Sequence, residues 1–209
     1  MVTDTAPATD ASAPADRDAS LWGPRAARAL GAVALLCILG WSVPALVMAN
    51  RGFAVQDEGT YVLSYRWWSS NPYFVSGAQY FYGPLFSAVN EQIGALRVLR
   101  LVMVIATNAW FAASFLRWLA HHRGVSSFGH TATSTALLTA AGGMAYLWTP
   151  LTPGYYDLTA DASIALVALM LSSLRRPTRL PAWLGLVAGG ISFLLVLTKW
   201  PAVLVVLLV

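Results

Sequence analysis

The adjacent acids Asp57 and Glu58 are the residues of this chain best placed to carry out chemistry. The chain of 209 residues holds nine acids, and four of them lie before residue 20, so a carboxylate pair beside apolar segments is unusual. A carboxylate is costly to hold at a low-dielectric boundary, because its charge prefers bulk water. A carboxylate held there can act as a general base that takes a proton from a hydroxyl group. The pair therefore predicts a catalytic site with Asp57 and Glu58 as its candidates.

Three cations are candidates for binding an anion such as phosphate. Arg97 and Arg100 lie one turn apart, and Lys199, the only lysine in the chain, precedes Trp200 and Pro201. Guanidinium groups grip phosphate bidentately, and an ammonium group binds it as a compact charge. The alternative is that these long side chains reach from membrane spans to lipid headgroups. The residues alone leave both interpretations open.

A second acidic pair, Asp157 and Asp161, is spaced i and i+4 at the start of a later apolar run. Asp157 is readily explained as a helix N-cap, which we favour. Asp161 lies one turn deeper, where a lone carboxylate in lipid needs a partner or a function. We therefore include both acids among the candidate substrate-binding residues.

Aromatic residues follow the acidic pair at helical spacing. If Asp57 caps a short helix, then Tyr61, Tyr65 and Trp68 fall on one face of it. Such a face predicts a helix that lies in the membrane interface, with its rings among the headgroups. A plainer interpretation makes Asp57 only a cap and the rings only an interfacial belt.

A second aromatic cluster extends from residue 73 to residue 86, and we expect a turn at Gly83-Pro84 within it. Together the two clusters predict a pocket lined by aromatic rings beneath the carboxylate, which suits a sugar carried on a lipid. The rings that we expect to contact substrate are Tyr61, Tyr80 and Tyr82.

The composition identifies a membrane protein. Hydrophobic residues make up 57% of the chain and charged residues only 11%, against about 25% charged in a typical soluble domain. The net charge of +4 does not indicate nucleic-acid binding, since the arginines lie mainly at the ends of apolar runs. Cys37 is the only cysteine, which excludes an intrachain disulfide.

The apolar runs predict an all-α, multipass transmembrane bundle with an outer-face loop that carries short interfacial helices. Several runs approach the ~20 residues needed to cross a bilayer. The first run is too long for a signal peptide and lacks a clear A-x-A cleavage site, so a signal anchor is the better interpretation. The chain stops within the last run, so we expect it to be an N-terminal piece of a longer protein. We expect about five full spans, at residues 29–49, 101–119, 133–148, 158–174 and 183–198, and the start of a sixth at 202–209.

Charge between the runs predicts the topology. Basic clusters alternate with loops poor in Arg and Lys, which places the clusters in the cytoplasm and the acidic loops on the outer face. Residues 1–24 are then a disordered cytoplasmic tail, residues 25–209 a membrane domain, and residues 50–92 its outer catalytic loop. The cytoplasmic clusters are Arg25 and Arg28; Arg117, His121, His122 and Arg123; and Arg175, Arg176 and Arg179.

Four motifs resemble the GT-C fold membrane glycosyltransferases, in particular the branch of protein O-mannosyltransferases and aminoarabinose transferases. The resemblance covers about residues 29–209, and only the first and last motifs are specific. The motifs are Asp57-Glu58-Gly59-Thr60-Tyr61 after the first span, Leu96–Leu101 with its two arginines, Gly154-Tyr155-Tyr156-Asp157, and the Gly-rich run 185–190 leading to Leu197-Thr198-Lys199-Trp200-Pro201.

The resemblance implies that Asp57 is the catalytic base and that Lys199 contacts a phosphate. Family members take a sugar from a polyprenyl-phosphate donor and invert its anomeric centre, so the implied partners are that donor and membrane lipid. The acceptor would be a hydroxyl group of an envelope glycan, a lipid or a protein. No cofactor is assigned. A divalent metal on Asp57, Glu58 and Asp157 stays open, since the three histidines, His121, His122 and His130, are expected in the cytoplasm.

Two other classes of function stay open, as does the oligomeric state. A transporter or flippase of a lipid-linked or anionic substrate would line its path with Asp57, Asp161 and Lys199. A membrane scaffold would use the charges only as caps and anchors. The acids gather at one expected face rather than deep in several spans, which favours an enzyme.

Overall fold

The computed structural model describes residues 23–52, 57–70, 76–123, 128–144, 151–174 and 182–199, without the side chains of Asp57 and residues 128–130. Several of the expectations above fall outside these residues. They are the disordered tail up to residue 22, the aromatic residues Tyr73 and Phe74, the basic cluster at 175–179, the Trp200-Pro201 step and the start of a sixth span.

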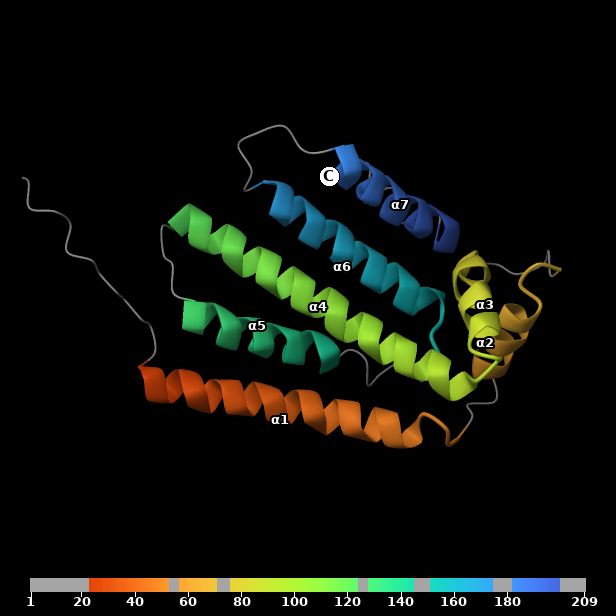
Figure 1. Ribbon diagram of the computed structural model, residues 1–209, viewed down its shortest axis with the longest axis horizontal. Coiled ribbons are helices and arrows are strands. Elements are labelled where there is room, and N and C mark those ends of the chain that lie inside the picture. Colours follow the sequence, from red (N-terminus) through yellow and green to blue (C-terminus); the bar gives the residue numbers. More distant parts are fainter. Residues whose placement is uncertain are drawn as a thin grey trace, which may run out of the picture.

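Within the described residues the chain is entirely helical, which confirms the all-α prediction. Five helices lie side by side in the order α1, α5, α4, α6 and α7, and the short helices α2 and α3 lie across one end of them (Figure 1). The seven helices are α1 (Pro24–Met48), α2 (Asp57–Arg66), α3 (Ala78–Ala88), α4 (Ile93–Arg123), α5 (Phe128–Gly143), α6 (Tyr155–Ser173) and α7 (Ala182–Thr198).

Three of the helices, α1, α4 and α6, are long and apolar enough to cross a membrane. Helices α5 and α7 occupy the places of two further expected spans, but they have 16 and 17 residues. At 1.5 Å per residue they measure about 24 and 26 Å, less than the ~30 Å of a hydrocarbon core. The membrane class is thus supported by three helices, and crossing by α5 and α7 stays a prediction.

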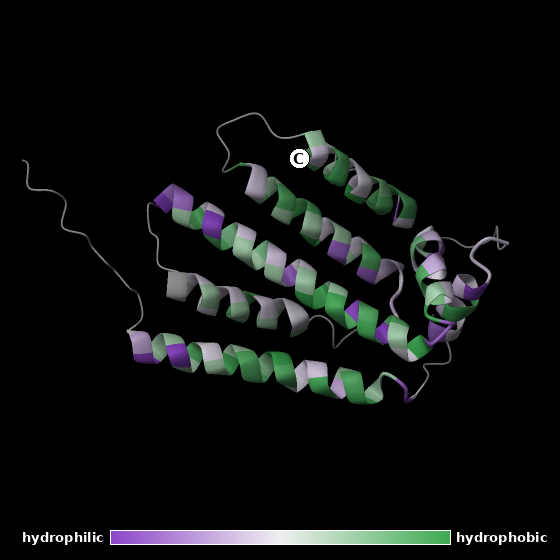
Figure 2. Ribbon diagram, viewed as in Figure 1, coloured by the Kyte–Doolittle hydropathy of each residue, from purple (hydrophilic) through white to green (hydrophobic). Residues whose placement is uncertain are grey.

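Two ends of the bundle differ in chemistry, and we name them for what they carry. The site end holds α2, α3 and residues 151–154, where α4 and α6 begin and α1 and α7 end. The basic end lies opposite, where α1 begins and α4 ends. Hydrophilic residues lie at both ends of α4 and at the N-terminal end of α6 (Figure 2). The basic end is defined by Arg25, Arg28, Arg117, His121, His122 and Arg123.

Helix α4 is longer than the sequence predicts, with 31 residues instead of the expected run over 101–119. Eight of the extra residues lie at its start, where Arg97 and Arg100 interrupt the apolar pattern, and four lie at its end. Both arginines are buried in the protein, at 3% and 1% exposure. Because their charges are met by carboxylates, the helix continues through them without exposing charge to lipid.

The aromatic face of α2 packs into the protein. Tyr65 is fully buried against Tyr82 and Phe86 of α3, with 5.5 Å between the Tyr65 and Tyr82 ring centres. A helix does begin at Asp57, as expected, but the expected placement of this face among headgroups is wrong for Tyr65. The cause is α3, which supplies an apolar partner surface close at hand in the sequence.

The turn expected at Gly83-Pro84 is also wrong, since both residues lie inside α3. Gly83 faces Trp68, and a Cβ atom at position 83 would overlap the Trp68 side chain. Proline usually breaks a helix because it lacks an N–H group. Here the packing of α3 on α2 outweighs that loss, and the glycine serves close approach rather than a turn.

Replacing Gly83 with alanine should therefore destabilise the protein, although alanine is the better helix former. The overlap with Trp68 predicts a loss of about 1–3 kcal/mol. The matched control is Gly189→Ala in α7, where a Cβ atom would meet nothing within 4 Å, and we expect that change to be neutral or stabilising. Thermal unfolding of the two variants in detergent measures the difference, and equal midpoints would contradict the packing argument.

Candidate functional site

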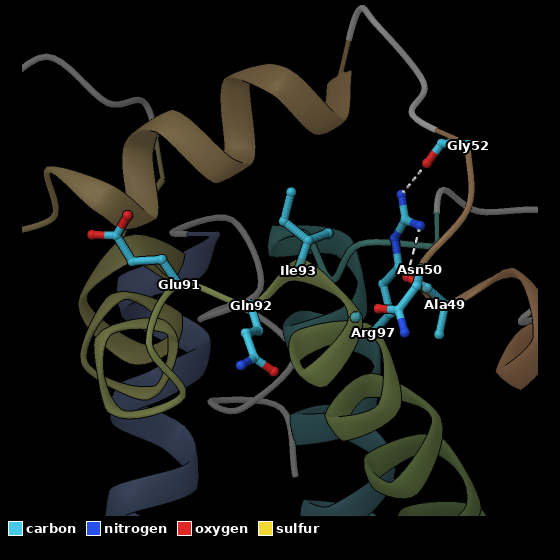
Figure 3. Close-up of a pocket in the computed structure, with 8 residues that line it drawn as sticks. Ala49, Asn50, Gly52, Glu91, Gln92, Ile93 and Arg97 are labelled. Atoms are coloured by element: carbon cyan, nitrogen blue, oxygen red, sulfur yellow. Dashed lines mark hydrogen bonds between the residues drawn. The ribbon is translucent and has the colours of Figure 1, made fainter.

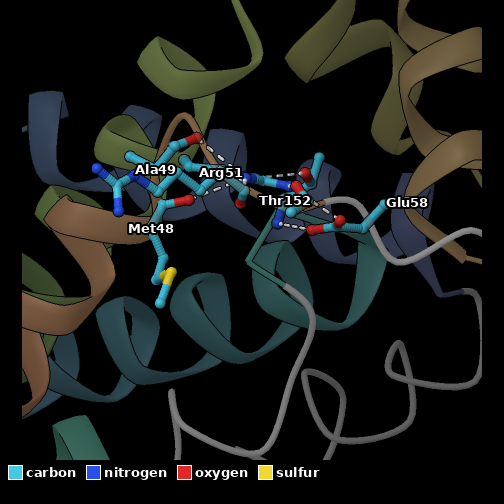
Figure 4. A network of polar contacts seen from close by, with 7 residues as sticks. Met48, Ala49, Arg51, Glu58 and Thr152 are labelled. Carbon is cyan, nitrogen blue, oxygen red and sulfur yellow. Dashed lines mark hydrogen bonds and ion pairs between the residues drawn. The ribbon is translucent and has the colours of Figure 1, made fainter.

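Arg97 is the centre of a buried polar network at the site end. Its Nη1 atom donates to the carbonyl oxygens of Met48, Ala49 and Arg51 at 3.2, 3.0 and 3.1 Å. Its Nη2 atom donates to the Gly52 carbonyl at 3.0 Å. The Met48 and Ala49 carbonyls end α1, where helical carbonyls lack intrahelical partners, and those of Arg51 and Gly52 follow it, so one guanidinium group binds the helix end and the chain just beyond it (Figure 4).

Glu58 completes this network from α2. Its Oε2 atom accepts from Arg97 Nη2 at 3.0 Å, and its Oε1 atom accepts from the Thr152 backbone N–H at 2.8 Å. Arg97 Nε donates to Thr152 Oγ1 at 3.2 Å. Both side chains of the ion pair are only 3% exposed. Glu58 therefore joins α2, α4 and the segment before α6, and a catalytic role for it stays a prediction.

Arg100 makes a second buried ion pair one turn further along α4. Its Nε and Nη2 atoms lie 2.8 and 2.7 Å from Asp157 Oδ1. Asp157 Oδ2 accepts the Gly154 N–H at 2.8 Å. Asp157 is thus the third residue of α6 rather than its N-cap, which is Gly154. The carboxylate stabilises the helix start from inside the first turn.

Asp161 lies one turn deeper in α6 and is 4% exposed. Its Oδ1 atom accepts from Thr107 Oγ1 of α4 at 2.9 Å. Its Oδ2 atom is buried and has no hydrogen-bond partner among the described residues. Thr107 is therefore a partner for one of the two carboxylate oxygens of Asp161.

The tyrosines named from the sequence differ in how accessible they are. Tyr82 is fully buried, Tyr61 is partly buried beside Gly154, and Tyr80 is 50% exposed. Burial raises the pKa of both Tyr65 and Tyr82 well above the usual value, so both phenols stay neutral. Tyr65 donates its hydroxyl to the Pro153 carbonyl at 2.6 Å. Tyr80 and Tyr61 are the rings that a ligand could reach, and Tyr82 is a core residue.

Lys199 lies directly after α7 with an exposed side chain, and its Nζ atom is 5.1 Å from the centre of the Tyr156 ring. This distance is within the range of a cation–π interaction. Thr198 is buried and receives a hydrogen bond from Thr159 Oγ1 of α6 at 3.2 Å. The Leu197 carbonyl accepts the Gly77 N–H at 2.9 Å. These contacts hold the end of α7 against α6 and the start of α3.

The structure thus brings most of the predicted site residues to one end. Glu58, Arg97, Arg100 and Asp157 form two ion pairs, and Lys199 lies beside the start of α6. The backbone of Asp57 begins α2, and its side chain lies outside the described residues. Sequence reasoning missed Thr152, for which no signal existed, and Tyr156, which precedes Asp157 in the quoted motif.

A surface pocket of about 340 Å³ opens between the end of α1 and the start of α4. Glu91 and Gln92 lie on one side of it, and Ala49, Asn50 and Gly52 lie across from them (Figure 3). Lys199 does not line this pocket. Among the described side chains, no group of three or more His, Cys, Asp or Glu residues could hold a metal ion.

Comparison with known proteins identifies no relative, since no protein-family model, no curated protein and no solved structure matches this chain.

The buried ion pair should contribute far more to stability than the exposed one. Removing one partner of a buried pair leaves an uncompensated charge, so Glu58→Ala should cost about 3–5 kcal/mol. Glu91→Ala is the matched control, because Glu91 pairs with Arg66 at 3.3 Å with both side chains about half exposed, and it should cost at most about 1 kcal/mol. Unfolding in detergent compares the two variants. Similar losses would show that the Glu58 pair does not organise the site end.

Proposed function

We propose that the protein is an integral-membrane glycosyltransferase that moves a sugar from a polyprenyl-phosphate donor to a hydroxyl acceptor, with inversion. The observation that carries the proposal is the position of Lys199. It is an exposed cation at the site end, with no carboxylate partner among the described residues. Arg97 and Arg100 are instead paired with carboxylates of the protein.

The surroundings of Lys199 suit a phosphate group. Its ammonium lies over the ring of Tyr156, a residue of the first turn of α6, and backbone N–H groups and the helix dipole favour an anion at a helix start. The carboxylate of that turn, Asp157, is neutralised by Arg100. A phosphate leaving group that gains negative charge during transfer would be stabilised by Lys199.

Of the acidic pair, Glu58 is engaged by the protein, so the proposal assigns the base to Asp57. Both oxygens of Glu58 accept hydrogen bonds from the protein, and the side chain is buried. In the proposed reaction the Asp57 carboxylate takes the proton of the acceptor hydroxyl, and the oxygen attacks the anomeric carbon. The attack comes from the face opposite the phosphate, the bond from that carbon to the phosphate breaks, polyprenyl phosphate leaves, and the centre is inverted. Arg97 and Arg100 then act as positioning residues for the ends of α1, α2 and α6.

A transporter is the second candidate function, and Asp161 is the observation that favours it. Its buried carboxyl lies in a candidate span, and its Oδ2 atom lacks a hydrogen-bond partner among the described residues. Buried acids in membrane spans often mark ion or substrate paths. The transporter predicts that Asp161→Asn stops function.

Replacing Asp57 with asparagine should abolish transfer and leave protein abundance unchanged. The assay uses a strain that lacks the gene, complemented with wild type, Asp57→Asn or Asp161→Asn. Lipid-linked sugars and envelope glycans are profiled by mass spectrometry. We expect the deletion and Asp57→Asn to accumulate one polyprenyl-phosphate sugar and to lose one glycan. Unchanged pools in the deletion, or full rescue by Asp57→Asn, would refute the proposed enzyme.

Replacing Lys199 with alanine should chiefly weaken donor binding. Loss of a charge-assisted contact to phosphate predicts a rise in donor KM of roughly 10-fold or more. Lys199→Arg keeps the charge and should retain most of the affinity. Arg51→Ala is the control, since Arg51 is an exposed cation at the same end whose backbone carbonyl alone enters the network. An equal effect of Lys199→Ala and Arg51→Ala would contradict a specific phosphate contact.

A further inference from the structure

The C-terminal end of α4 carries exposed basic side chains that pair with no described acid. Arg117 and His121 are spaced i and i+4, so they share one face of the helix. Both side chains are exposed, and Arg117 has no carboxylate partner among the described residues. The acids of the described part of the chain, from Asp57 to Asp161, belong to elements of the site end. Among the described residues, the basic end therefore carries basic side chains and no acid.

An exposed apolar stripe leads along α4 toward Arg117 and His121. Val98, Val102, Ala106 and Trp110 recur every four residues, and each is exposed to the surroundings. At 100° per residue the same face continues, with a gradual drift, to Arg117. Arg117 and Ala106 are eleven residues apart, about 16 Å along the helix axis. That is close to half of the ~30 Å hydrocarbon core, the depth that one lipid tail fills.

We propose that this face of α4 binds one anionic phospholipid, with its phosphate held by Arg117 and His121 and one acyl chain along Trp110 and Ala106. The guanidinium group of Arg117 donates two parallel hydrogen bonds to phosphate oxygens, and His121 donates a ring N–H. The indole of Trp110 packs on the chain. The site is separate from the candidate site and does not depend on the proposed function.

The arrangement favours a lipid over a free anion. A soluble phosphate would contact only Arg117 and His121 and would leave the apolar stripe without a partner. A phospholipid matches both parts at once, since the charged group and the apolar surface lie in the order and at the spacing of a headgroup and its chain. Arg25, Arg28 and Arg123 at the same end add long-range attraction, which favours a lipid of net negative charge over a zwitterionic one.

The test is native mass spectrometry of the full chain in detergent, titrated with phosphatidylglycerol or with phosphatidylcholine of the same acyl chains. We expect the first phosphatidylglycerol to bind about 10-fold more tightly than phosphatidylcholine. Arg117→Gln should weaken phosphatidylglycerol binding by about fivefold, the effect of one arginine near an anionic headgroup. It should weaken phosphatidylcholine binding less, because that lipid shares the phosphate contact but carries no net negative charge. Arg117→Lys should restore part of the loss.

Two controls make the result specific. Arg51→Gln removes an exposed arginine at the opposite end and should leave binding of both lipids unchanged. Trp110→Ala should weaken the binding of both lipids to a similar extent, since it alters the contact with the acyl chain. Equal binding of the two lipids to wild type, or equal effects of Arg117→Gln and Arg51→Gln, would overturn the proposal. Displacement of phosphatidylglycerol by millimolar inorganic phosphate would also overturn it, because the ligand would then be the free anion.

Discussion

The structure of the site end depends on one buried guanidinium group. Every N–H group of Arg97 can be used, because its three nitrogens donate to four backbone carbonyls, one hydroxyl and one carboxylate. A buried charge is tolerated only when it is paired and hydrogen-bonded in this way. Because losing any partner of Arg97 would be costly, the end of α1, the start of α2 and the segment around Thr152 are held at fixed positions.

The segment before α6 shows how this requirement extends to the candidate site. Thr152 is held through its backbone N–H and its hydroxyl, Pro153 through its carbonyl and Gly154 through its N–H. Each of these contacts comes from another part of the chain or from inside α6. The first turn of α6 is therefore rigidly placed, and with it Tyr156, the ring that Lys199 contacts. Rigid placement of a cation beside a helix start is what preorganised anion binding needs.

The sequence was sufficient for the helix class, the sites of five long helices and the start of α2 at Asp57. Hydropathy and spacing carry that information, because they act over many residues. They could not show that Arg97 and Arg100 pair with Glu58 and Asp157, since those partners lie 39 and 57 positions away. The glycine at 83 was misjudged for a related reason. Its role depends on its contact with Trp68, which follows α2, and local turn preferences cannot predict such a contact.

The contact between Gly77 and Leu197 bears on how α7 can turn about its own axis. A one-residue rotation would move each side chain of α7 by about 100°. It would also withdraw the Leu197 carbonyl from the Gly77 N–H, and it would part Thr198 from Thr159. Because Gly77 has no side chain, α3 approaches the Leu197 backbone closely enough for this bond. The rotational setting of α7 is therefore coupled to α3, and the direction in which Lys199 points is set by a residue far from it in sequence.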